Sequence, residues 1–343
     1  MIVYFPAQIG ALSSIFGVQF VSLFGIKARY SNLIAILLVL FLLGINLIGT
    51  KFSSKMQSVI TILKIIPIAL IIIWGLFNPA KIPAPIIPLT VGTGHSFPTA
   101  ISQGLLSALF AFEGWIVVTN LANEVKNPEK DLSRAIILGL SAITLIYVLI
   151  NYTFMTVLPI DQLTNNNNAA FQASMKLFGQ FGGKLVTVGI LISVYGAVNA
   201  FMLTGMRTPY ILAQDNLLPF SNKIGKANIH TGVPVVGAFI VDAIAIVMIL
   251  LGNFTVLTDM LVFVMWTFNT MLSVAVIILR KREPELKRPF KVPWYPIIPI
   301  ISVIGGIFIV VSTIINQFVL SIIGIGLTLL GLPIYYYMQK KNN

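Results

Sequence analysis

The sequence contains no cysteine at all, and it has only two histidines in 343 residues. Without thiols the chain can form no disulfide, no thiolate metal site and no cysteine nucleophile. The two histidines, His95 and His230, are far apart in predicted loops, so a histidine metal cluster is not expected either. We therefore predict a protein that holds no metal and no cofactor.

Charged side chains are also scarce: they make up 9% of the chain, whereas a soluble domain has about 25%. Hydrophobic residues make up 57%, and the mean hydropathy is +0.95. These values predict an integral membrane protein. The net charge of +12 could indicate nucleic acid binding, but basic cytoplasmic loops explain it better, so no nucleic acid partner is expected. No secretory signal peptide is visible at Met1.

Long apolar runs dominate what remains. A transmembrane helix needs about 20 apolar residues, and windows of that length predict about ten spans within one membrane domain, residues 1–343. The chain is therefore predicted to be all-α and to cross the bilayer many times. The predicted spans lie near residues 1–24, 32–50, 57–77, 101–122, 136–158, 185–213, 234–252, 257–279, 296–316 and 318–338.

The basic residues predict the orientation of these spans. Sixteen of the 22 lysines and arginines fall in one set of alternate loops and at the C-terminus, and five fall in the opposite set. Because cytoplasmic loops carry the excess of basic residues, the first set and the C-terminus are predicted to be cytoplasmic. The expected location is the cell membrane. An even number of spans then places the N-terminus on the same side.

The segment 109–136 contains an acid–glycine pair, Glu113-Gly114, inside an apolar run. A carboxylate within a membrane is costly, so it should face a polar cavity or pair with another group such as Lys64. Glycine allows the helix to break, and freed backbone groups are tolerated only where they line a cavity. Because the aromatic residues Phe110, Phe112 and Trp115 surround the pair, we favour a substrate cavity, with the carboxylate meeting an ammonium group or a proton.

Lys64 lies inside the third predicted span, with Pro67 three residues further on. It could be a snorkelling lysine whose amine reaches the membrane interface. It could instead be a buried amine that supplies a positive charge or carries a proton. We favour the second interpretation, and Pro67 should weaken the helix nearby.

Four further polar residues lie in predicted spans. Asp242 and Asp259 are interpreted as structural, the first facing a neighbouring helix and the second lying near the interface. Tyr195 and Asn199 share a helix that is rich in small residues, which favour close helix packing. Both side chains could reach the cavity or simply pack.

The sequence shows no arrangement expected of an enzyme. It contains no nucleophile–base pattern and no dinucleotide motif, and GQFGGK at 179–184 lacks the spacing and hydroxyl residue of a phosphate-binding loop. We therefore predict a carrier that is neither catalytic nor driven by ATP.

Three ordered motifs resemble one family of membrane proteins. They are FAFEGW followed by NEVKNPEKDLSRAI, then SVYGAVNAFMLTGMRTPYILAQDNLLP, then FNTMLSVAVIILRKREPELKRPFKVPWYPIIPII. They resemble the sixth, eighth and tenth helices, with their following loops, of the amino acid–polyamine–organocation permeases, particularly the L-amino-acid exchangers and the bacterial serine/threonine exchanger type. The resemblance covers essentially the whole chain.

The resemblance implies a fold of two inverted five-helix repeats followed by two further helices. Residues 1–77 would then be helices three to five of the first repeat, 101–279 the second repeat, and 296–338 the terminal pair. Helices one and two, including the glycine-rich break of helix one, would be missing.

The resemblance also implies roles for single residues. Phe110 matches the aromatic gate over the substrate, and Gly114 falls in the unwound part of helix six. Glu113 takes the place of an aspartate found in several exchangers. Lys64 matches the helix-five lysine that replaces a sodium ion in some proton-coupled members, and Trp266 matches a cavity-lining aromatic residue.

Taken together, these features predict a secondary transporter of L-amino acids that works by alternating access, either by exchange or by proton coupling. Its expected partners are the amino acid, the lipid bilayer and a candidate proton; nothing in the sequence indicates an oligomer or a partner subunit. The alternative is a truncated, non-transporting permease fragment or a membrane scaffold, which the missing helices favour.

Overall fold

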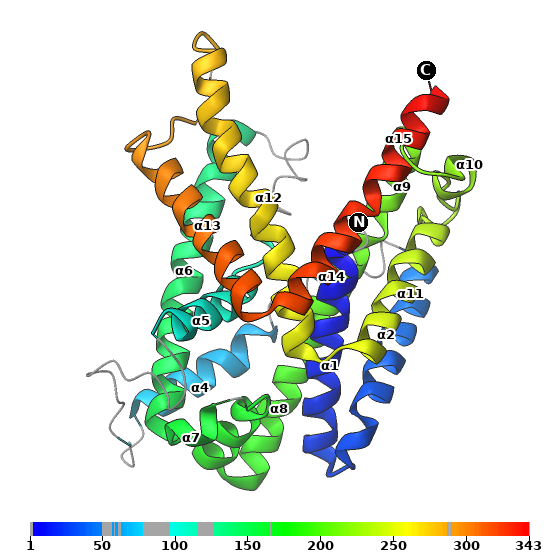
Figure 1. Ribbon diagram of the computed structural model, residues 1–343. Coiled ribbons are helices and arrows are strands. Elements are labelled where there is room, and N and C mark those ends of the chain that lie inside the picture. The colour runs from blue at the N-terminus through cyan, green and yellow to red at the C-terminus, as the bar shows by residue number, and fades with distance from the viewer. Residues whose placement is uncertain are drawn as a thin grey trace. The chain divides into compact units, whose positions relative to one another are not determined.

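The computed structural model describes residues 3–49, 57, 59–60, 63–77, 82, 97–115, 127–164, 166–286, 288 and 290–342. All regular secondary structure in these ranges is helical (Figure 1). In chain order the elements are α1 (Tyr4–Phe24), η1 (Ala28–Tyr30), α2 (Ser31–Ile48), α4 (Ile65–Phe77), α5 (Phe97–Ala111), α6 (Pro128–Val157), α7 (Ile160–Leu163), α8 (Ala169–Gly205), α9 (Arg207–Gln214), α10 (Ser221–Ile224), α11 (Val235–Leu251), α12 (Phe254–Arg282), α13 (Ile297–Asn316), α14 (Phe318–Leu329) and α15 (Gly331–Asn342).

The helices agree with the predicted membrane spans. Within the described ranges, seven helical segments are long and apolar enough to cross a membrane, and α4, α5 and α11 are shorter apolar helices. These segments follow the order of the predicted spans, so the prediction of an all-α, multi-pass membrane protein is confirmed. The predicted span 101–122 is only partly visible, because residues 116–122 lie outside the described residues.

The chain divides into two compact units, which we describe separately. Unit 1 contains residues 1–88, 149–257 and 326–343, and unit 2 contains residues 89–148 and 258–325. The predicted repeat boundaries stay a prediction. Helix α6 contributes its first part to unit 2 and its last part to unit 1.

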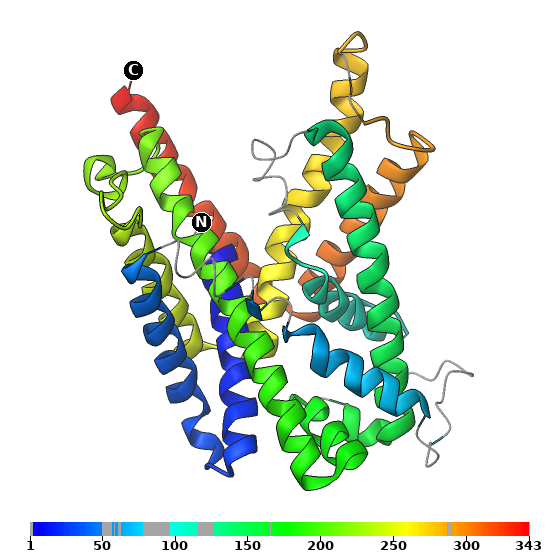
Figure 2. The ribbon, with the colours of Figure 1, turned by 180° about the vertical axis from the view of Figure 1, so that it is seen from behind.

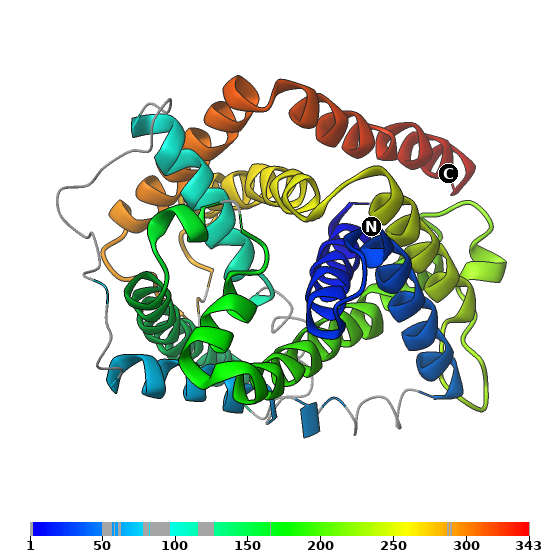
Figure 3. The same ribbon diagram turned by 90° about the horizontal axis from the view of Figure 1, so that it is seen from below.

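Unit 1 is built around α1, which packs against α2, α8 and α11 (Figure 3). Small residues on α1 let these neighbours approach closely: a methyl group at Gly17 would overlap the backbone carbonyl of Ser31 on α2. The buried apolar core comes from all four helices and the connections beside them. It comprises Phe5, Ile9, Ala35, Leu38, Val39, Leu42, Leu43, Val198, Met202, Met206, Val233, Ala238, Val241, Ala245 and Ile249.

A second packing face of α8 receives α4 and the residues just before it. Ile60 lies against Gly196, and Pro67 lies against Gly189. Helix α8 (green in Figure 2) is bent at Gly179, whose φ of 67° lies in the left-handed region that favours glycine. Pro67 lies in the first turn of α4, where a missing backbone donor is tolerated. The helical run is interrupted at Lys64, three residues before this proline.

Unit 2 holds α5, the first part of α6, most of α12, α13 and the start of α14. Gly306 of α13 lies against Thr270 of α12, and the hydroxyls of Ser273 and Ser302 are 2.9 Å apart. The outer face of α13 exposes large apolar side chains such as Ile304, which is 63% exposed. In a bilayer this face would meet lipid tails, which are as apolar as the side chains themselves.

Candidate functional site

Helix α5 stops at the acid–glycine pair. The helix ends at Ala111, and residues 112–114 form a turn in which the amide of Glu113 donates to the carbonyl of Phe110 at 3.1 Å. Gly114 has a φ of 109°, a conformation that side chains on L-residues rarely adopt. The helix break predicted from Gly114 is therefore present, and it leaves the last carbonyls of α5 without helical partners.

Tyr147 of α6 satisfies one of these carbonyls. Its hydroxyl donates to the backbone carbonyl of Ala111 at 2.6 Å, and its ring packs edge-to-face on Phe112 with centroids 5.1 Å apart. Tyr147 was not among the site residues predicted from the sequence. The available signal was a tyrosine within the apolar run ILGLSAITLIYVLI, because a tyrosine hydroxyl within a membrane segment needs a partner.

Replacing Tyr147 by phenylalanine is expected to lower amino acid uptake by about fivefold. The substitution keeps the ring contact with Phe112 but removes one hydrogen bond of about 1 kcal/mol that holds the end of α5. Initial uptake rates and melting temperature should be measured together, with Tyr152→Phe as the control. Tyr152 is exposed on α6 and makes no hydrogen bond within the described part of the chain, so its replacement should leave uptake unchanged. Equal uptake by the two variants would contradict a positioning role for Tyr147.

Unit 2 contains most of the predicted substrate-binding residues. Phe110 is half-buried in the last turn of α5, and Glu113 and Gly114 follow it in the turn. Trp115, directly after the turn, is 39% exposed. Trp266 is half-buried in the middle of α12, where its carbonyl accepts a hydrogen bond from the hydroxyl of Thr270 at 2.6 Å. Phe110, Glu113, Gly114 and Trp115 thus lie together at the C-terminal end of α5.

The predicted pair on α8 belongs to unit 1. Asn199 is fully buried, and its amide donates to the side-chain oxygen of Gln57 at 3.1 Å. Gln57 in turn donates to the carbonyl of Gly196 at 2.9 Å, so Asn199 takes part in the packing of α8. Tyr195 lines an apolar cavity of about 280 Å³ between α1 and α8, together with residues such as Phe16 and Leu191.

Lys64 occupies a turn directly before α4. Its backbone amide donates to the carbonyl of Ile60 at 2.9 Å, and its side chain is half-buried. Residues 60, 64 and 67 have the spacing of one helical face, and Ile60 and Pro67 both contact α8. Lys64 therefore lies in sequence between two residues that contact α8.

The two intramembrane aspartates are buried within helix packing. Asp242 is 3% exposed on the side of α11 that also buries Ala238 and Ala245. Asp259 of α12 is 7% exposed, and it accepts a hydrogen bond of 2.8 Å from the amide of Gln317, which lies between α13 and α14. This bond ties the α13–α14 connection to α12 and agrees with the structural role predicted for Asp259.

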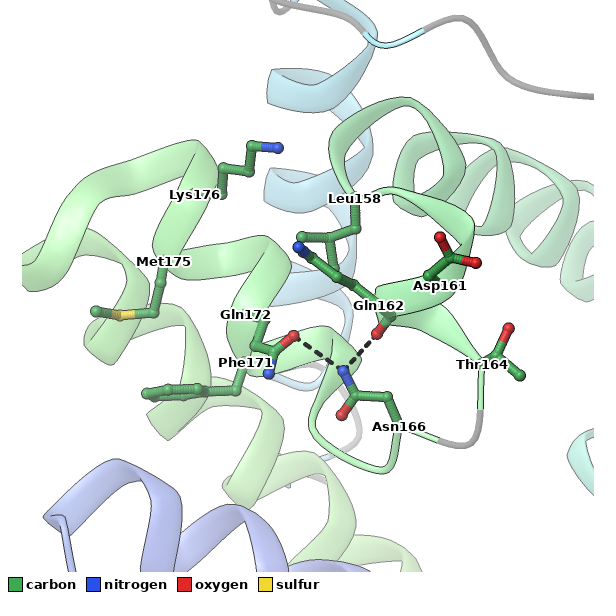
Figure 4. A pocket seen from close by; sticks show the side chains of 9 residues that line it. All are labelled: Leu158, Asp161, Gln162, Thr164, Asn166, Phe171, Gln172, Met175 and Lys176. Carbon is green, nitrogen blue, oxygen red and sulfur yellow. Dashed lines mark hydrogen bonds between the residues drawn. The ribbon is translucent and has the colours of Figure 1, made fainter.

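A polar cavity of about 910 Å³ opens at the connection between α6 and α8 in unit 1 (Figure 4). Its polar groups hold the connection together: the amide of Asn166 donates to the carbonyl of Gln162 and to the side chain of Gln172. The ammonium group of Lys176 donates to the carbonyl of Val157 at the end of α6. The cavity lining contains none of the residues that the sequence predicts to bind substrate.

Helices that break inside the membrane are typical of secondary transporters. The all-α, multi-pass architecture and the break beside Glu113 therefore indicate a membrane carrier. The chain belongs to the amino acid permease family, which it matches over residues 1–337. The resemblance predicted from the three motifs is therefore confirmed.

Individual relatives show which transporters of this family the chain is similar to. The chain is 37% identical to the serine/threonine exchanger SteT of Bacillus subtilis (strain 168), an alignment that covers 99% of this chain and 77% of the relative. It is 26% identical to the human cystine/glutamate transporter over 96% of this chain and 66% of the relative. It is 25% identical to the mouse b(0,+)-type amino acid transporter 1 over 83% of this chain and 58% of the relative. The prediction of amino acid transport is confirmed at the level of the family, and these relatives give the fragment alternative no better support.

Proposed function

We propose that this chain is a secondary carrier that moves L-amino acids across the cell membrane by alternating access. The observation that carries the proposal is the end of α5, where a break at Gly114 places freed backbone groups beside the carboxylate of Glu113. Backbone amides and carbonyls at a helix break match the carboxylate and ammonium groups of an amino acid. The relative named as a serine/threonine exchanger makes serine and threonine the first substrates to test.

The proposed roles of the site residues follow from their chemistry. In unit 2, Phe110 covers the bound substrate, Glu113 attracts its ammonium group, and Trp115 and Trp266 supply aromatic surface. In unit 1, Tyr195 lines an apolar cavity. Asn199 supports the same helix through the bond between its amide and Gln57. The C-terminus is cytoplasmic in this proposal, because the basic residues concentrate on its side.

Uptake into proteoliposomes tests the proposal. Vesicles containing the purified chain should accumulate labelled serine or threonine faster when the same amino acid is present inside, if the carrier exchanges substrates. Acceleration by an inward pH gradient would indicate proton coupling instead. If folded protein takes up no L-amino acid under either condition, the carrier proposal is wrong and a non-transporting membrane protein is favoured.

Lys64 is proposed as the ion-coupling residue, since a lysine at this depth can replace or relay a cation. Lys64→Ala is therefore expected to flatten the dependence of uptake on external pH. The control is Lys184→Ala, which removes an exposed lysine of α8 and should keep the wild-type profile. Uptake rates should be recorded across a pH series for all three proteins. A Lys64→Ala variant that transports with the wild-type pH profile would exclude the coupling role.

A further inference from the structure

The connection between α12 and α13 is the most basic segment of the chain. Residues 280–295, RKREPELKRPFKVPWY, contain six lysines and arginines but only two acids. The segment belongs to unit 2, and it runs from the last turn of one membrane helix to the residue before Pro296, which precedes the next helix. It therefore lies where lipid headgroups would surround it.

Two arginines are used to fold the connection. The guanidinium of Arg280 lies 3.9 Å from the centre of the Tyr295 ring, so it joins the end of α12 to the approach to α13. Arg288 donates to four backbone carbonyls, those of Leu279, Glu283, Pro284 and Leu286, at 2.6–3.4 Å. These contacts give the connection a defined shape against the end of α12.

Among the described residues of this connection, three other basic side chains are exposed. Lys281 and Arg282 extend the end of α12, and Lys291 follows in the connection. Within the described residues none of the three forms an ion pair, although Glu283 and Glu285 are close in sequence. Their charges are therefore available to an anionic group outside the chain.

The same segment presents aromatic side chains outward. Trp294 is 79% exposed, and its φ of 48° is an unfavourable conformation for a residue with a side chain. Phe290 is 45% exposed. If the basic residues served only to orient the protein in the membrane, the connection would need neither a strained backbone nor an exposed tryptophan. Tryptophan prefers the headgroup level of a bilayer, where its ring is apolar and its indole N–H finds acceptors.

We infer that the α12–α13 connection binds the headgroup of an anionic phospholipid. Lys281, Arg282 and Lys291 contact the phosphate and the other polar atoms of the headgroup. Trp294 inserts beside the glycerol backbone of the lipid. Basic clusters directly next to a membrane helix attract anionic lipids in this way. The inference concerns lipid binding, and it stands whether or not the chain transports amino acids.

Lipid-dependent quenching of Trp294 tests this inference. The purified chain is placed in vesicles of phosphatidylcholine doped with brominated phosphatidylglycerol or with brominated phosphatidylcholine. The Trp294 signal is the fluorescence difference between the wild type and Trp294→Phe. The phosphatidylglycerol analogue should quench it at a roughly tenfold lower mole fraction, and added salt should reduce this preference.

Neutralised variants show whether the three cations cause the preference. In the triple variant K281Q/R282Q/K291Q, both brominated lipids should quench Trp294 equally. The control variant K223Q/K226Q/K340Q loses the same charge elsewhere and should keep the wild-type preference for phosphatidylglycerol. The inference is overturned if the triple variant keeps its preference, or if both triple variants lose it equally. Soluble glycerol 3-phosphate at the same phosphate concentration should leave the quenching preference intact; competition by it would assign the site to free phosphate compounds instead.

Discussion

Replacing Gly114 by alanine is expected to lower amino acid uptake by about tenfold or more. Gly114 has a φ of 109°, and an alanine there would be strained by about 1–2 kcal/mol. Alanine also favours a helix over glycine by about 1 kcal/mol, so both effects favour extending α5 through Glu113. An extended helix would take up the last carbonyls of α5 in helical bonds and displace the hydrogen bond from Tyr147 to Ala111. Initial rates of labelled serine uptake into proteoliposomes measure the effect, with the amount of folded protein determined in parallel.

Gly104→Ala is the matched control for this change. Gly104 lies within the same helix α5, and a methyl group there would meet no atom within 4 Å. Its replacement should leave uptake unchanged and should stabilise the helix slightly, by up to about 1 kcal/mol. Wild-type uptake by Gly114→Ala would show that the break is not part of the transport site.

Replacing Glu113 by glutamine is expected to weaken the transport of cationic amino acids about tenfold more than that of neutral ones. Glutamine keeps the shape of the side chain and removes its charge. A contact between opposite charges that is partly shielded from water contributes about 1.5–3 kcal/mol, and a cationic substrate loses more of this attraction than a neutral one. Competition by lysine and by serine against labelled serine uptake compares the two substrate classes in one assay.

The control for Glu113→Gln is Glu285→Gln, the same chemical change at an exposed acid of the α12–α13 connection. This variant should keep the wild-type ratio of the two substrates. If Glu113→Gln loses both substrates equally while remaining folded, the carboxylate does not select substrate charge, and its role is limited to the α-ammonium group that both substrates share or to the structure of the site.

The break in α5 shows how far a local pattern predicts structure. Glu113-Gly114 within an apolar run was sufficient to predict the position of the break, because only glycine readily adopts the backbone conformation required. The partner that satisfies the helix end was not predictable. Tyr147 donates to the carbonyl of Ala111 across 36 residues of sequence, and no local pattern relates the two.

Lys64 and Asn199 show the same limit in the packing of unit 1. Depth in a predicted span indicated that Lys64 is unusual, and Asn199 was expected either to reach the cavity or to pack. The neighbours of both residues depend on how α8 meets the segment before α4. There Asn199 bonds to Gln57, and Lys64 occupies a turn rather than the interior of a helix. Pro67 was expected to weaken the helix nearby; it lies in the first turn of α4, and the helical run is interrupted at Lys64 just before that turn.

Composition and hydropathy alone predicted a helical, multi-pass membrane protein, because backbone groups within lipid must be satisfied inside each helix. The described residues confirm that class with seven helices long enough to span a membrane and three shorter apolar ones. The order of three motifs predicted its family, which the match over residues 1–337 confirms. Tertiary structure was needed to find that α1 is the centre of unit 1, that Asp259 holds the α13–α14 connection, and that two arginines fold the α12–α13 connection while three cations remain exposed. Each of these three findings depends on contacts between residues separated in sequence or on the direction of a side chain. A local sequence pattern encodes neither the contacts nor the directions.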